Sequence, residues 1–185
     1  LKKGDWFVLA GSLPESIPQT FLMEIASICS DQNVHFVLDT SGPALKELVL
    51  TQPFLIKPNE HELGELFDTI IANKQEACHY AKRLVNQGVQ HVIVSMGKEG
   101  ALLVTKDLVV SAEAPKGKVV NTVGSGDSLI SGFIASFTND KDAEKAFRYG
   151  VASGSATAFR SDLCEKSDVE SLVEQVLLHP FQEQD

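Results

Sequence analysis

The sequence predicts an α/β fold: a doubly wound, mostly parallel sheet with helices on both faces and an antiparallel hairpin at one edge. Three observations support this prediction. Short apolar runs alternate with helix-length amphipathic stretches, polar or glycine-rich segments follow the apolar runs, and two later apolar runs are separated by a short polar turn. Strands that are apolar throughout are typical of parallel sheets that helices bury on both faces.

The first half of the chain alternates strands with helices. The predicted strands cover residues 6–10, 34–38, 54–56 and 91–95, and the predicted helices lie near residues 18–30, 43–50, 60–67 and 74–87. Parallel strands need a crossover connection, and a helix is the usual one. These elements therefore predict a parallel sheet with helical crossovers.

The second half of the chain is predicted to form a hairpin followed by helices. Strands 100–104 and 108–112 are separated by Lys106-Asp107 and predict a hairpin. Three helices are predicted over residues 125–138, 142–159 and 167–178, with turns at 139–140 and 161–162. Ser167 or Asp168 is the expected N-cap of the last helix, and residues 180–185 are expected to form a polar, frayed tail.

Composition limits the possible functions. The 185 residues, 43% of them hydrophobic, predict one soluble domain with a single core. A net charge of −9 argues against a nucleic-acid partner, since phosphate backbones are bound by clustered Lys and Arg. No apolar run reaches the ~20 residues of a membrane span. Cys29, Cys78 and Cys164 are far apart and odd in number, so we expect reduced thiols in a cytoplasmic protein.

The segment Gly124-Ser125-Gly126-Asp127, followed by an apolar helix pattern, is the strongest functional signal. Two glycines let the backbone turn tightly with free N–H groups, and the helix directs the positive end of its dipole to the same point. Such a loop predicts an anion hole, and Asp127 adds a carboxylate that could accept a proton from an attacking hydroxyl. The alternative is an ordinary loop that ends in a helix cap. The spacing matches neither a P-loop nor a dinucleotide-binding fingerprint.

A polar or glycine-rich segment follows every predicted parallel strand. In an open α/β sheet the ligand lies beyond the carboxyl ends of the strands. The segments at those positions are residues 11–14, 39–42, 57–62, 95–100 and the loop before Asp127.

These segments, in this order, resemble the ribokinase-like (PfkB) family of sugar kinases. The resemblance is carried by Asn59-x-x-Glu62, by Ser95-Met96-Gly97-x-x-Gly100 and by the Gly-Ser-Gly-Asp signature that opens a helix. It covers essentially all 185 residues but corresponds to the C-terminal part of such a kinase. It therefore implies the nucleotide-binding and catalytic part of a single ribokinase-like domain, without the N-terminal substrate and lid portion. The start at Leu1, close to a strand, likewise leads us to expect a missing N-terminal portion.

The resemblance implies ATP and Mg²⁺ as cofactors and assigns roles to two motifs. Asp127 would be the catalytic base, with Gly124, Ser125 and Gly126 supplying the anion hole. Asn59 and Glu62 would organise Mg²⁺ near the phosphates, through water. The same spacing also fits a helix capping box, and the sequence leaves both interpretations open.

The resemblance to the family also implies which residues contact the nucleotide. Ser95, Gly97 and Gly100 lie where the nucleotide contacts of the family fall, and the alternative is a plain hairpin turn. Residues 114–118 and 151–155 resemble the two walls of the adenine pocket, with Ser153 as a polar contact. The alternative for Ser153 is tight helix packing.

Two residues that follow strands leave their roles open. Lys57 could contact a phosphate or could be solvated. Asp39 could form a strand-terminating turn or part of a polar floor near ATP, and we leave it unassigned.

The sequence looks most like the phosphosugar branch of the family at residues 11–14, 39–42, 56–59 and 121–124. This branch includes 1-phosphofructokinase and tagatose-6-phosphate kinase. The function expected is phosphoryl transfer from ATP to a hydroxyl of a ketohexose phosphate, with a small-molecule phosphosugar as partner and a homodimer possible for the full-length protein. A kinase for an unphosphorylated sugar or nucleoside, and a non-catalytic nucleotide-binding fragment, remain as alternatives. Asn121 stands where many relatives have Asp in a monovalent-cation loop, which makes a potassium requirement doubtful.

Overall fold

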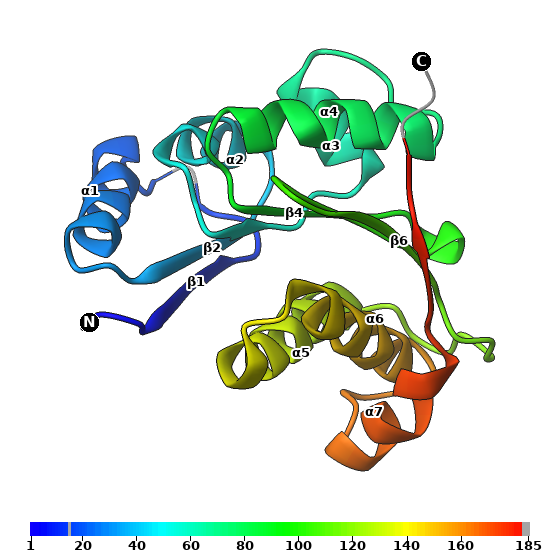
Figure 1. The fold of residues 1–185 in the computed structure, drawn as a ribbon. Coiled ribbons are helices and arrows are strands. Elements are labelled where there is room, and N and C mark those ends of the chain that lie inside the picture. The colour runs from blue at the N-terminus through cyan, green and yellow to red at the C-terminus, as the bar shows by residue number, and fades with distance from the viewer. Residues whose placement is uncertain (15, 183–185) are drawn as a thin grey trace. The chain divides into compact units, whose positions relative to one another are not determined.

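The computed structural model of the chain describes residues 1–14 and 16–182 (Figure 1). The strands are β1 (Trp6–Ala10), β2 (His35–Asp39), β3 (Leu55–Ile56), β4 (His91–Ser95), β5 (Ala101–Thr105), β6 (Val109–Glu113) and β7 (Leu177–Pro180). The α-helices are α1 (Gln19–Asp31), α2 (Gly42–Leu48), α3 (Glu60–Leu66), α4 (Lys74–Asn86), α5 (Ser125–Asp140), α6 (Ala143–Ala158) and α7 (Lys166–Leu172). Short 3₁₀ turns cover Val49–Thr51, Gly97–Glu99 and Val173–Gln175.

The predicted α/β class is confirmed. The strands are ordered from β1 to β7 in one mostly parallel sheet, with parallel pairing among β1, β2, β3 and β4 and antiparallel pairing of β6 with β7. The chain divides into two compact units, and each is considered separately. Among the described residues, unit 1 lies within 1–94 and 104–108, and unit 2 comprises 95–103 and 109–182.

Unit 1 contains the parallel strands and their crossover helices. Val37, Leu38, Leu55 and Ile56 are fully buried, as expected of strands covered on both faces. Figure 1 shows α1, α2, α3 and α4 along the same side of β1, β2 and β4. Crossovers between parallel strands are right-handed, so a strand order that follows the chain order brings successive helices to one face.

The strand ends of unit 1 are in register. Leu38 of β2 pairs with Ile56 of β3, so the residues that follow, Asp39 and Lys57, lie at the same carboxyl edge of the sheet. This alignment brings together two residues that are 18 positions apart in the sequence.

Unit 2 contains α5, α6 and α7 with the antiparallel strands. α5 and α6 approach so closely that side chains would not fit at Gly150 and Gly154. A Cβ atom on Gly150 would lie 2.7 Å from the carbonyl oxygen of Leu129, and one on Gly154 would lie 2.9 Å from that of Ser125. Glycine therefore allows backbone to touch backbone between the two helices.

The predicted helix 167–178 is wrong in its second half. α7 ends at Leu172, and Leu177–Pro180 form β7, which pairs with β6 in the register Ala112↔Leu178. The predicted N-cap is also wrong, since Glu165 caps α7 and Asp168 occupies the third helical position of a capping box. Of the predicted tail, Pro180 belongs to β7, and residues 183–185 lie outside the described residues.

The predicted turn at residues 139–140 is wrong because α5 continues through Asp140. The side chains of Thr138 and Asn139 donate to carbonyl oxygens four residues earlier, at 2.7 and 3.1 Å, instead of initiating a turn. The helix ends one residue later, where Lys141 adopts a left-handed conformation with φ of 56°. The predicted bend at residues 161–162 is confirmed. No helix among the described residues is long and apolar enough to cross a membrane.

Candidate active site

The predicted anion-binding loop opens α5, as expected. Gly124 is the N-cap and adopts φ of 78° and ψ of −3°, a conformation that favours glycine. The Asn121 side chain shapes the approach by accepting the Val123 N–H at 3.0 Å. Ser125 N–H donates to the Thr122 carbonyl oxygen at 3.2 Å. Because the N–H groups of a first helical turn largely lack intrahelical acceptors, the start of this 16-residue helix is suited to an anion.

Two side chains of this first turn could contact a ligand. Asp127 lies in the first turn of α5 and is exposed. The hydroxyl of Ser125 is buried, and within the described part of the chain it has no hydrogen-bond partner. Buried hydroxyls nearly always find a partner, so Ser125 marks a place where a ligand or water would complete the site.

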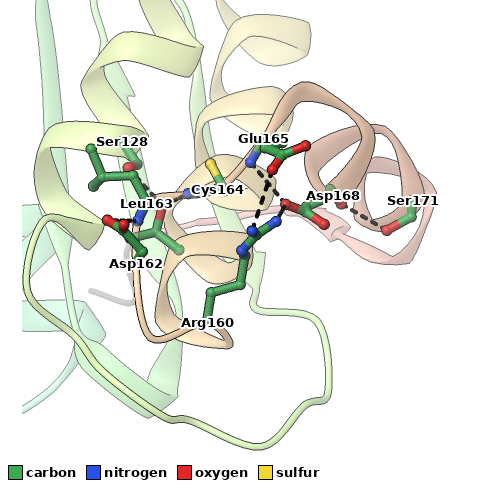
Figure 2. A network of polar contacts seen from close by, with 9 residues as sticks. Ser128, Arg160, Asp162, Leu163, Cys164, Glu165, Asp168 and Ser171 are labelled. Carbon is green, nitrogen blue, oxygen red and sulfur yellow. Dashed lines mark hydrogen bonds and ion pairs between the residues drawn. The ribbon is translucent and has the colours of Figure 1, made fainter.

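The loop after α6 lies beside this first turn and is held by ion pairs (Figure 2). Arg160 pairs with Asp168 and, at 3.4 Å, with Glu165. The Glu165 N–H donates to Asp168 at 2.8 Å, and this bond together with the Arg160 guanidinium lowers the pKa of the Asp168 carboxyl. The same carboxylate raises the pKa of Arg160. The N-terminus of α7 is therefore tied to the end of α6.

The segment with Ser95, Gly97 and Gly100 forms a 3₁₀ turn. Met96 N–H donates to the Gly100 carbonyl oxygen at 2.9 Å, and Gly100 N–H donates to that of Gly97 at 3.1 Å. Gly100 has φ of 87°, and a Cβ atom there would lie 1.9 Å from the Ala112 carbonyl oxygen. The fold alone therefore requires glycine at 100, whereas Gly97 is exposed with open space around it.

The two predicted adenine walls lie in unit 2. In the first wall, Gly117 packs so tightly on Phe159 that a Cβ atom would lie 2.3 Å from the ring. In the second, Ser153 is buried, and its hydroxyl donates to the Tyr149 carbonyl oxygen at 2.9 Å. A Cβ atom on Gly132 would lie 2.2 Å from that hydroxyl oxygen. These contacts support the packing interpretation of Ser153, and its nucleotide contact stays a prediction.

Asn59 and Glu62 form the capping box that the sequence left as one of two interpretations. Glu62 N–H donates to Asn59 Oδ1 at 2.9 Å, and Asn59 N–H donates to Glu62 Oε2 at 2.8 Å. Glu62 also lines a cavity of about 230 Å³ between α2 and α3. Across the described residues no group of three or more His, Cys, Asp or Glu side chains could hold a metal. A cation at Asn59 and Glu62 would thus need most of its ligands from water and phosphate.

Lys57 and Asp39 form an ion pair with Nζ and Oδ1 3.0 Å apart. Their side chains are 9% and 15% exposed, so the interpretation of Lys57 as a solvated residue is wrong. Contact of Lys57 with a phosphate is not tested by this geometry. The sequence left Asp39 unassigned, although the residues that follow neighbouring parallel strands could have been paired by register alone.

The candidate residues fall in both units. Unit 1 carries Lys57, Asn59 and Glu62, and unit 2 carries the remaining candidates: Ser95, Gly97, Gly100, Gly124, Ser125, Gly126, Asp127 and Ser153. Within unit 2, the anion-binding loop and Ser153 share the α5–α6 pair.

Comparison with known proteins identifies relatives over nearly the whole chain. The model of the pfkB family of carbohydrate kinases matches residues 1–169. The chain is 51% identical over 176 residues to 1-phosphofructokinase of Bacillus subtilis, covering 95% of this chain and 58% of that protein. It is 33% identical over 174 residues to D-tagatose-1-phosphate kinase of Bacillus licheniformis, covering 94% and 57%.

A solved structure gives the same result for the fold. Phosphofructokinase-2 from Escherichia coli, in complex with substrates and products, superposes with a TM-score of 0.88 at 30% identity, covering 94% of this chain and 58% of that one. The chain thus spans less than two thirds of the length of these relatives.

Proposed function

Because this chain belongs to the pfkB family of carbohydrate kinases, we propose that it is the nucleotide-binding and catalytic part of a sugar-phosphate kinase. Residues 1–185 then form the C-terminal part of one ribokinase-like domain, and the substrate and lid portion lies outside them. The share of each relative that this chain spans supports assignment to a part of such a kinase.

The proposed reaction transfers the γ-phosphoryl group of ATP to a hydroxyl of a ketohexose phosphate. The relatives named 1-phosphofructokinase and D-tagatose-1-phosphate kinase support a ketohexose phosphate as the acceptor. The acceptor oxygen forms a bond to the γ-phosphorus while the bond to the bridging β–γ oxygen breaks, and ADP leaves.

The chain's own residues would act on the proton and on the developing charge. Asp127 accepts the proton of the acceptor hydroxyl as the oxygen–phosphorus bond forms. The N–H groups around Gly124, Ser125 and Gly126 stabilise the negative charge on the transferred phosphoryl oxygens, aided by the dipole of α5. The exposed position of Asp127 beside these amides is the observation that carries the proposal.

Asn59 and Glu62 are the residues we propose to organise Mg²⁺. The cation would neutralise charge on the ATP phosphates. Amide and carboxylate oxygens are suitable donors, but each residue already uses one oxygen in the capping box. The remaining carboxylate oxygen of Glu62 fits an outer-sphere role, in which it accepts hydrogen bonds from water on the cation.

The test is a coupled ADP-release assay with fructose 1-phosphate, tagatose 6-phosphate and fructose 6-phosphate, run on the intact kinase and on the 185-residue chain, which we expect to be inactive alone. In the intact kinase we expect Asp127→Asn to lower kcat at least ~10²-fold with nearly unchanged ATP affinity, because it removes the base and leaves the loop. Asp140→Asn, at the other end of α5 and about 20 Å away, is the matched control. A near-normal kcat for the Asp127 variant would remove it from the base role.

The second candidate is nucleotide binding without turnover. The share of the relatives that this chain spans favours it, since a sugar site built largely outside these residues would be incomplete. Saturable binding of MgADP in calorimetry with no ADP release on any of the three sugars would support this candidate.

A further inference from the structure

The hydroxyl of Thr157 joins three segments of unit 2. Thr157 lies on α6 and is 1% exposed. Its Oγ1 lies 2.7 Å from Oγ of Ser128 in α5, and it accepts the Cys164 N–H from the following loop at 3.2 Å. Figure 2 shows Ser128, Leu163 and Cys164 gathered at this junction.

Thr157 and its neighbour Leu163 also pack against Gly124 in the predicted anion-binding loop. A Cβ atom on Gly124 would lie 2.8 Å from Cδ2 of Leu163 and 4.0 Å from Cγ2 of Thr157. One turn earlier on α6, Gly154 packs on the Ser125 carbonyl oxygen. The first turn of α5 therefore rests on α6 and on the loop that leaves it.

Apart from this packing, the side chains of the first turn offer few hydrogen bonds that could fix its orientation. Gly124 and Gly126 have no side chains, Asp127 is exposed, and the Ser125 hydroxyl is without a partner in the described structure. Within the described residues 124–128, the side-chain hydrogen bond seen is the one between Ser128 and Thr157. Ser128, which makes this bond, is the residue directly after the proposed base Asp127.

The Thr157 hydroxyl can bond to both neighbours at once. Its Oγ1 accepts the Cys164 N–H with one lone pair, and in the bond with Ser128 either hydroxyl can be the donor. The loop that carries Cys164 is in turn held by the ion pairs of Arg160 with Glu165 and Asp168. Ion pairs at the start of α7 thus restrain the start of α5 through one threonine.

We propose that Thr157 is a positioning residue: it fixes the rotation of the first turn of α5 and so the direction of the Asp127 carboxylate. The consequence for catalysis rests on the proposed role of Asp127 as base. A proton acceptor must be held in a narrow geometry, and a misplacement of about 1 Å can cost up to ~10²-fold in rate. A restraint one residue away supplies such geometry without contact with the substrate.

The experiment compares three variants of the full chain by amide hydrogen exchange in nuclear magnetic resonance spectra. Thr157→Val keeps the side-chain shape and removes the hydroxyl, whereas Thr157→Ser keeps the hydroxyl and removes the methyl group. Ser155→Ala is the matched control, because that hydroxyl is on the same helix and donates to the Val151 carbonyl oxygen within it at 2.8 Å.

We expect Thr157→Val to speed exchange at the amides of Ser128 and Cys164 at least about fivefold more than in the middle of α5 and α6. Thr157→Ser should restore slow exchange, and Ser155→Ala should leave both amides unchanged. Equal acceleration at all amides, or no change at these two, would overturn the inference. If the valine variant does not fold, Ser128→Ala removes the same bond from a half-buried position and should speed exchange at residue 128.

Turnover is measured on the same variants and separates this inference from the proposed function. With turnover present, Thr157→Val should lower kcat about tenfold and leave KM for ATP within about twofold, and Thr157→Ser should recover most of kcat. An unchanged kcat despite faster exchange would overturn positioning of a catalytic group. Absence of turnover in the intact kinase that contains this chain would count against the proposed function alone, because the exchange data still decide whether Thr157 fixes the turn.

Discussion

Replacing Lys57 by Met should destabilise the chain strongly. The substitution keeps the length of the apolar side chain and removes the ammonium group 3.0 Å from Asp39. Removal of one partner of a buried ion pair costs about 3–5 kcal/mol, because the other charge stays buried and loses that interaction. The side chains of Lys57 and Asp39 are only 9% and 15% exposed, so the buried value applies.

The corresponding change in melting temperature is large. For a domain of this size, 1 kcal/mol corresponds to about 2–4 °C. A loss of 3–5 kcal/mol therefore lowers Tm by about 6–20 °C, which thermal unfolding followed by circular dichroism measures directly. Urea unfolding should show a lower midpoint with an unchanged slope.

Two further variants make this prediction refutable. Lys46→Met removes a pair with Asp68 at 3.5 Å whose side chains are 56% and 86% exposed, and it should cost no more than about 1 kcal/mol. The double variant Asp39→Asn with Lys57→Met removes both charges and should recover much of the stability. If Lys57→Met costs as little as Lys46→Met, the pair is not effectively buried and the reasoning is wrong.

Two other predictions concern buried polar groups. Ser125→Ala should leave the free energy of unfolding unchanged or raise it by up to about 1 kcal/mol, because the hydroxyl is buried without a partner among the described residues; a clear loss in urea unfolding would contradict this. Burial lowers the pKa of His91, which binds a proton more readily in the unfolded chain. Stability should therefore fall as pH decreases from about 6.5 toward that lowered pKa, and His91→Phe should flatten this part of the stability–pH curve; an unchanged slope would contradict it.

Most of the sheet could be predicted because its pattern is local. Each of the parallel strands is mostly apolar and is separated from the next by a helix-length segment, so the fold class followed from periodicity. The loop before Asp127 could be found for the same reason, since two glycines, a serine and a helix start are contiguous.

The features that were missed depend on contacts between distant residues. Residues 167–178 have a helical pattern, but Leu177 and Leu178 form a strand because β6 offers an antiparallel edge, as the pair Ala112↔Leu178 shows. β7 is short and ends at Pro180, which is tolerated where no further strand pairs. The bond between Ser128 and Thr157 has no sequence signal, since it depends on how two helices dock.

The Asn59 and Glu62 motif shows another limit of prediction from the sequence. The same spacing serves helix capping and cation binding, and the sequence could not separate them. The structure confirms the cap, and a role with a cation remains a proposal that the cap does not prevent.

The backbone contact between α5 and α6 has a mechanical consequence. Where Gly150 and Gly154 let one helix touch the other directly, no long side chain lies between them to change rotamer and absorb a displacement. The two helices should then vibrate as one stiff body. The amides at the start of α5, which we propose to face a phosphate, would share the rigidity of a helix pair. An incoming anion would then meet dipoles whose directions are already fixed and would spend little of its binding energy on ordering them.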